Sequence, residues 1–153
     1  MLYEREKLMD KKILAEELFT TGINCAQAVM LAFKKELNLS EEVIKKISIS
    51  HGGGLGRQRL TCGAVSSMCA VLGYLLTDGN DKLKAYKFVQ DACERFKNEC
   101  GSIICADLLG KEGQKPISPV PEDRTKEYYK KRPCGELCGI AAKIAQDILE
   151  ENK

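Results

Sequence analysis

The stretch that decides the fold of this chain covers residues 51–73 and reads His-Gly-Gly-Gly-Leu-Gly-Arg-Gln-Arg-Leu-Thr-Cys-Gly-Ala-Val-Ser-Ser-Met-Cys-Ala-Val-Leu-Gly. Glycine disfavours a helix because of its backbone freedom, so its four occurrences in five residues predict a loop. These glycines are Gly52, Gly53, Gly54 and Gly56. Thr61 then has the character of an N-cap, and the apolar residues after it predict a helix from Cys62 to about Leu76.

This arrangement would place Cys62 in the first turn of a helix, behind the glycine loop. Unpaired N–H groups and the helix dipole favour negative charge at that position, which lowers the pKa of a thiol. Arg57 and Arg59 lie just before it and add positive charge. We therefore predict that Cys62 is a reactive or metal-ligating cysteine.

Helical periodicity continues on both sides of this stretch, and no segment has the pattern of a strand. Asn24 and Ser40 are predicted N-caps, and a segment with three of the four prolines, residues 111–123, is predicted to be an extended loop that serves as a lid or a surface strap. We expect an all-α fold: a single domain over residues 1–153, built as a bundle of six or seven helices. Besides the helix after the glycine loop, the expected helices cover residues 2–19, 25–37, 40–47, 81–99, 103–109 and 134–151, and the charged segment 122–131 is a candidate for a further, solvent-facing helix.

Composition and charge exclude several classes of function. The chain has 153 residues and a net charge of +2, with 24 basic residues scattered among 22 acidic ones, so nothing favours binding to nucleic acid. No apolar run is long enough to insert in a membrane, and the N-terminal residues lack the apolar core of a signal peptide. We therefore expect a cytoplasmic protein.

The eight cysteines are the unusual feature of the composition. In a reducing cytosol, an excess of cysteine indicates metal binding or redox chemistry more often than disulfides, although free cysteines also pack in cores. The absence of a Cys-x-x-Cys motif argues against a thioredoxin-like dithiol and a zinc ribbon. The glycine loop lacks the third glycine of a dinucleotide fingerprint and the Gly-Lys-Ser/Thr ending of a Walker loop.

Four cysteines begin predicted helices or lie in their first turns. They could converge on one site and bind a metal: Cys25, Cys62, Cys105 and Cys134. Fe–S clusters and structural zinc both accept four thiolates, although four unrelated buried thiols would give the same spacing. Cys138 lies one turn after Cys134 and would be a second ligand or part of the core. Cys69 and Cys93 have apolar neighbours at core spacing, which favours packing.

These residues resemble a known family, the redox-active proteins with the signature C_GCAxxG_C_C. The resemblance rests on four segments in order: Asn-Cys-Ala-Gln-Ala-Val at 24–29, the glycine loop with Cys-Gly-Ala-Val-Ser at 62–66, Cys-Gly-Ser-Ile-Ile-Cys-Ala-Asp-Leu-Leu-Gly at 100–110, and Cys134. Ser67 stands where the motif ends in glycine. The resemblance implies redox activity and a prosthetic group such as an Fe–S cluster.

Three functions are consistent with the sequence. The first is electron transfer, with an Fe–S cluster or another thiophilic metal on the four cysteines and with cofactor contacts from Gly52, Gly53, Gly54, Gly56 and Arg57. The second is a metal-free thiol/disulfide redox enzyme in which Cys62 is the reactive thiol. The third is a structural helical domain with packing cysteines. The partner would be a redox protein, a small-molecule thiol or a metal, and the sequence leaves a homodimer and a ligand role for His51 open.

Overall fold

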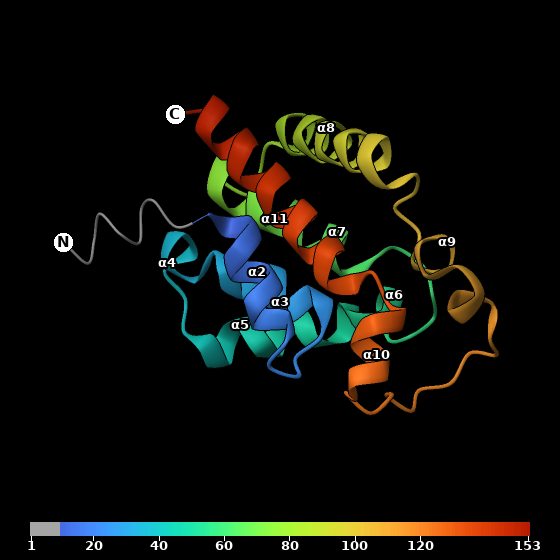
Figure 1. The fold of residues 1–153 in the computed structure, drawn as a ribbon. Coiled ribbons are helices and arrows are strands. Elements are labelled where there is room, and N and C mark those ends of the chain that lie inside the picture. Colours follow the sequence, from blue (N-terminus) through green and yellow to red (C-terminus); the bar gives the residue numbers. More distant parts are fainter. Residues whose placement is uncertain (1–9) are drawn as a thin grey trace.

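Helix α3 (Cys25–Ala32) lies at the centre of the structure, a computed structural model that describes residues 10–153. Seven of its eight residues, Ala26 to Ala32, are buried, because helices cover it on several sides (Figure 1). The largest buried side chains, among them Phe33, Met68 and Phe96, fill the space between α3 and its neighbours. This core fixes the N-terminal ends of the helices that carry the cysteines.

The described part of the chain is all-α, as expected, apart from one isolated bridge between Thr61 and Ile104. Six of its helices have eight or more residues, and shorter segments join them. In chain order these elements are α2 (Lys11–Phe19), α3, α4 (Lys34–Leu37), α5 (Glu41–Ser48), η1 (Ile49–His51), α6 (Gly52–Leu55), α7 (Gly63–Leu76), α8 (Lys82–Cys100), α9 (Cys105–Leu109), η2 (Gly110–Gln114), α10 (Lys126–Lys131) and α11 (Cys134–Glu151).

The predicted N-caps at Asn24 and Ser40 are confirmed. Asn24 accepts a hydrogen bond from the Gln27 backbone N–H, and the Gln27 side chain accepts one from the Asn24 N–H, which completes a capping box. The Asp10 side chain caps α2 by accepting a hydrogen bond from the Lys12 backbone N–H. The predicted helix over residues 2–19 is therefore confirmed from Lys11 onward, and its first part lies outside the described residues.

The predicted start of the helix after the glycine loop, α7, is wrong by one residue. Thr61 is not its N-cap, because the Thr61 backbone pairs with Ile104; Cys62 takes the capping position and α7 begins at Gly63. Two other boundaries also differ. The helix expected over 25–37 is interrupted at Phe33. The helix expected from residue 103 begins at Cys105, because Ser102 Oγ accepts the Ile104 N–H in a turn before it.

The glycine loop forms a left-handed turn, labelled α6. Five consecutive residues, Gly53 to Arg57, have φ between 61° and 73°. This conformation costs an ordinary residue about 1–2 kcal/mol, and glycine avoids most of that cost at three of the five positions. The prediction that these glycines interrupt right-handed helix is therefore confirmed.

A short antiparallel contact then joins the starts of α7 and α9. The Cys62 N–H donates to the Ile103 carbonyl over 2.8 Å, and the Cys105 N–H donates to the Leu60 carbonyl over 2.6 Å. These backbone hydrogen bonds hold the starts of α7 and α9 together, with Cys62 opposite Ile103 and Cys105 opposite Leu60.

The proline-rich segment runs from η2 to α10 as extended chain around one end of the bundle, the end at which α6, α9 and the start of α11 meet (Figure 1). Tyr128 in α10 is half-buried, so α10 does not face only solvent as the sequence suggested. Within residues 10–153, we find no helix with the length and apolar character needed to cross a membrane.

Candidate redox site

A cavity of about 570 Å³ lies at the end of the bundle where four helix N-termini meet. All four predicted site cysteines line it: Cys25, Cys62, Cys105 and Cys134. Cys25, Cys105 and Cys134 are the first residues of α3, α9 and α11, and Cys62 is the N-cap of α7. The fold therefore places these four residues around one cavity.

The glycine loop supplies another side of this cavity. Gly52, Gly53 and Gly56 line it together with Arg57. Gly54 and His51 are not among the lining residues. A side chain at Gly54 would meet the Leu60 backbone nitrogen at 2.6 Å, so this glycine allows close packing behind the cavity.

Cys25 and Cys62 form a hydrogen-bonded pair in the cavity wall. The Cys62 thiol donates to Cys25 Sγ, and the backbone N–H groups of Gly53, Ala26 and Ala64 also stabilise the Cys25 thiolate. The pair lowers the pKa of Cys25 from 9.0 to about 6, with the Cys62 hydrogen bond as the largest cause and burial as the opposing one. Cys25 is half-buried and therefore reachable from the cavity, whereas Cys62 is only 5% exposed.

The prediction of a lowered pKa for Cys62 is wrong. Its pKa is raised well above the ordinary value, first because its proton is held by Cys25, then because the thiol is buried and lies near the negative charge of Cys25. The residue at the N-cap of α7 is thus the proton donor of the pair, and the residue in the first turn of α3 is the thiolate. The sequence showed two cysteines at helix N-termini but not which one would donate to the other.

Gly63 permits this arrangement, because α3 and α7 meet at its Cα. A Cβ at this position would lie 2.7 Å from Cys25 Sγ and 2.7 Å from the His51 carbonyl oxygen. Both separations are shorter than van der Waals contact allows. Any side chain at residue 63 would therefore displace the Cys25 sulfur.

The other cysteines near the cavity are protonated thiols. Burial, and then the charge of Cys25, raises the pKa of Cys134 to about 12. Burial also raises the pKa of Cys105, although Arg59 Nη1 lies 3.8 Å from its sulfur and opposes the rise. Cys138 is fully buried behind the cavity, where its thiol donates to the Cys25 carbonyl oxygen over 3.7 Å.

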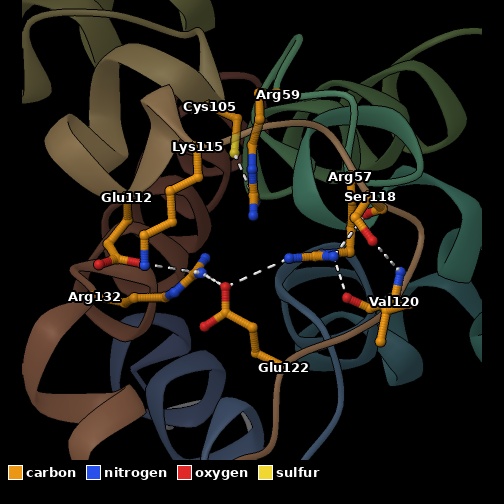
Figure 2. A network of polar contacts seen from close by, with 9 residues as sticks. All are labelled: Arg57, Arg59, Cys105, Glu112, Lys115, Ser118, Val120, Glu122 and Arg132. Carbon is orange, nitrogen blue, oxygen red and sulfur yellow. Dashed lines mark hydrogen bonds and ion pairs between the residues drawn. The ribbon is translucent and has the colours of Figure 1, made fainter.

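Four arginines and one glutamate line the cavity, so its wall carries an excess of positive charge: Arg57, Arg59, Arg124, Arg132 and Glu122. Arg57 and Arg132 both contact Glu122 Oε1, and Arg57 also donates to the Ser118 carbonyl oxygen over 2.6 Å. These contacts tie the proline-rich segment to the glycine loop and to the C-terminal end of α10. Figure 2 shows Arg59 beside Cys105, with its guanidinium directed toward the space between Arg57, Arg132 and Glu122.

Arg124 is held differently, by aromatic rings. Its guanidinium carbon lies 4.7 Å from the ring centre of Phe19 and 4.6 Å from that of Tyr128. Its Nη1 is buried and has no hydrogen-bond partner in the part of the chain that the structure describes. The predicted site did not include Arg124 or Arg132. The one available signal was that Arg132 lies two residues before Cys134.

The four thiols fit a metal only in part. They share a cavity, and thiolates are the ligands that zinc and Fe–S clusters accept. However, among residues 10–153, no three or more Cys, His, Asp or Glu side chains are close enough together to hold a metal ion. To hold a metal, the thiols would have to approach one another.

The comparison with family models agrees with these features. Residues 23–148 match the model described as "Putative redox-active protein (C_GCAxxG_C_C)", which covers most of the chain. The chain belongs to this family of redox-active proteins. Neither a curated protein nor a solved structure matches it.

Proposed function

We propose that this protein exchanges electrons with a disulfide substrate through Cys25 and Cys62. The observation that carries the proposal is that Cys25 and Cys62 line the same cavity wall and that the Cys62 thiol lowers the pKa of Cys25 to about 6, which favours the Cys25 thiolate at neutral pH. The thiolate is the attacking species in thiol–disulfide exchange, and the attack is fastest when its pKa is near the ambient pH. Cys25 has this property and Cys62 is placed to resolve the product.

In the first step, Cys25 Sγ attacks one sulfur of the substrate disulfide. The substrate S–S bond breaks, its electron pair leaves on the second sulfur, which takes a proton, and a mixed disulfide forms at Cys25. This step removes the charge and the hydrogen-bond acceptor that raise the pKa of Cys62. The Cys62 thiol therefore loses its proton only after Cys25 has reacted.

In the second step, the Cys62 thiolate attacks Cys25 Sγ and releases the first substrate sulfur, which also takes a proton. Two electrons have then passed from the two protein thiols to the substrate, which leaves as two thiols, while Cys25 and Cys62 form a disulfide. A redox partner protein or a low-molecular-weight thiol would return the electrons. We propose that this cycle operates in the cytoplasm, where such thiols are kept reduced.

The charge of the cavity favours a substrate with an anionic group. Arg57 and Arg132 contact Glu122. Among residues 10–153, the buried Nη1 of Arg124 has no hydrogen-bond partner, and the Arg59 side chain hydrogen-bonds only to the sulfur of Cys105. A carboxylate would accept hydrogen bonds from these two guanidinium groups. Glutathione disulfide, which carries several carboxylates, is therefore a suitable probe substrate.

Trapping the mixed disulfide tests the proposal. In Cys62→Ser, resolution is blocked, so one glutathione should stay on Cys25 after reaction with glutathione disulfide. In Cys25→Ser, the cavity should take up none. Equal labelling of both variants, or glutathione on Cys62 alone, would reject Cys25 as the attacking thiol.

A second candidate function is electron transfer or binding by a thiolate-held metal or Fe–S cluster. The observation in its favour is that four cysteines from four helices line one cavity, beside arginines that would offset the charge of a thiolate cluster. It requires Cys105 and Cys134 to move toward the Cys25–Cys62 pair. Stoichiometric iron with sulfide, or zinc, in protein purified without oxygen would support this candidate.

A further inference from the structure

A second pair of cysteines lies outside the cavity, between α7 and α8. Cys69 Sγ and Cys93 Sγ are 3.8 Å apart, and both side chains are half-buried at the edge of the core. The apolar neighbours of each residue at core spacing predicted simple packing. The contact itself has no signature in the sequence, because the two residues lie on different helices. Neither belongs to the four segments that carry the family resemblance.

We propose that Cys69 and Cys93 are a second, independent redox pair, which a low-molecular-weight disulfide oxidises to a disulfide between α7 and α8. Their sulfurs must approach by about 1.8 Å to reach the S–S bond length of about 2.05 Å. Two side chains share that movement. The packing of α7 on α8 keeps the sulfurs together in the reduced protein.

The environment of Cys93 supports its role as the attacking thiol. The hydrogen bond from Cys69 lowers the pKa of Cys93 to about 7, burial opposes this effect, and the charge of Lys97 assists it. Cys69 correspondingly has a raised pKa, because its proton is held by Cys93 and because it is buried. Half-exposed and partly ionised at neutral pH, Cys93 can react with a disulfide from solvent.

The exchange takes place in two steps, and in each one sulfur attacks another. Cys93 Sγ attacks a sulfur of glutathione disulfide, the S–S bond breaks, and one glutathione leaves as a thiol after taking a proton. The Cys69 sulfur, freed of its hydrogen bond to the Cys93 thiolate, loses its proton and attacks Cys93 Sγ. The second glutathione leaves as a thiol, so glutathione disulfide is reduced to two thiols and the protein dithiol is oxidised.

This pair is separate from the cavity. Cys62 and Cys69 are seven residues apart at the start and in the middle of α7, which is about 10.5 Å along the helix. Direct exchange between the two sites would require sulfurs in contact, so each pair must react on its own. The two proposals can therefore fail separately.

The test uses the full chain with Cys62→Ser, incubated in glutathione buffers of increasing oxidised fraction, alkylated and digested with trypsin. Cleavage after Arg59 and Lys82 gives the peptide 60–82, in which Cys69 is then the only cysteine, and cleavage after Lys87 and Arg95 gives the peptide 88–95 with Cys93. We expect a cross-link between these two peptides, two hydrogens lighter than their sum. It should increase with the oxidised fraction and disappear on treatment with dithiothreitol.

Two variants complete the design. Cys69→Ser should accumulate glutathione on Cys93, because the resolving thiol is missing. Cys100→Ser removes another half-buried thiol from α8 and should leave the cross-link unchanged. Glutathione held on Cys93 without a cross-link when Cys69 is present, or two unmodified thiols in the most oxidising buffer, would overturn the proposal.

Discussion

Replacing Cys62 with alanine should raise the pKa of Cys25, because the Cys62 thiol is the largest of the groups that stabilise the Cys25 thiolate. The backbone N–H groups of Gly53, Ala26 and Ala64 remain in the variant, but so does the burial that opposes ionisation. We expect the pKa to rise from about 6 by at least about one unit, toward or beyond its ordinary value of 9.0. The direction of this shift tests whether the two cysteines act as a pair.

The magnitude decides which quantity should be measured. At pH 7, a thiol of pKa 6 is about 90% ionised and one of pKa 9 about 1%, a ratio of about 90. The thiolate of higher pKa is, however, intrinsically more reactive, by about 20-fold for a difference of three units with a Brønsted coefficient of 0.4–0.5. At a single pH the two effects nearly cancel, so the rate of reaction of Cys25 would fall only about fourfold. The midpoint of the pH profile retains the whole shift.

The assay is therefore the rate of Cys25 alkylation by iodoacetamide from pH 4.5 to 10, followed by peptide mass spectrometry. The wild-type midpoint should lie near pH 6, and Cys69→Ala, which removes a thiol from the same helix as the control, should keep it there. A midpoint that stays near 6 in Cys62→Ala would refute the pairing and assign the low pKa to the backbone N–H groups alone.

Four further outcomes are expected. Gly63→Ala should lower the free energy of unfolding by about 1–3 kcal/mol and disturb Cys25 alkylation, whereas Gly73→Ala in the same helix, where a Cβ meets nothing within 4 Å, should be neutral or slightly stabilising in chemical denaturation. The stability advantage of the wild type over Cys25→Ser should grow by up to about 2.6 kcal/mol between pH 5 and pH 8, because a depressed folded-state pKa gives stability that is lost as the pH falls through 6; denaturation at both pH values measures it. Arg59→Met should raise the KM for glutathione disulfide about tenfold but leave that for neutral hydroxyethyl disulfide unchanged, and equal effects on both would exclude charge recognition. Oxidation of the second pair, which closes a loop between residues 24 positions apart, should stabilise the protein by about 3.5 kcal/mol or less, measured by denaturation with and without dithiothreitol.

Much of the fold was accessible from the sequence, because local signals determine it. Asn24 and Ser40 cap the helices that they were expected to cap, and the glycines of α6 end the right-handed helix. The four cavity cysteines could be selected because each lies at a helix N-terminus. The start of α7 was predicted one residue too early, because Thr61 has the character of an N-cap. Its backbone instead pairs with Ile104, more than 40 residues away.

The chemistry inside the cavity could not be derived from the sequence, because it depends on contacts between distant segments. Whether Cys25 or Cys62 carries the thiolate depends on the direction of one hydrogen bond and on the close approach allowed by Gly63. Arg124 lies in the loop before α10, and its guanidinium at the cavity packs against Phe19 of α2 and Tyr128 of α10. The Cys69–Cys93 contact likewise depends on the packing of α7 against α8.

The central claim is that Cys25 and Cys62 work as a thiol pair, and one measurement on protein purified without oxygen tests it most directly. Cys25 alkylation at pH 7 is followed in the same sample in which iron, sulfide and zinc are determined. The account predicts that Cys25 is alkylated faster than Cys62, Cys105 and Cys134, without metal in stoichiometric amount. Stoichiometric iron and sulfide, or zinc, with all four thiols protected until a chelator or acid removes the metal, would contradict it.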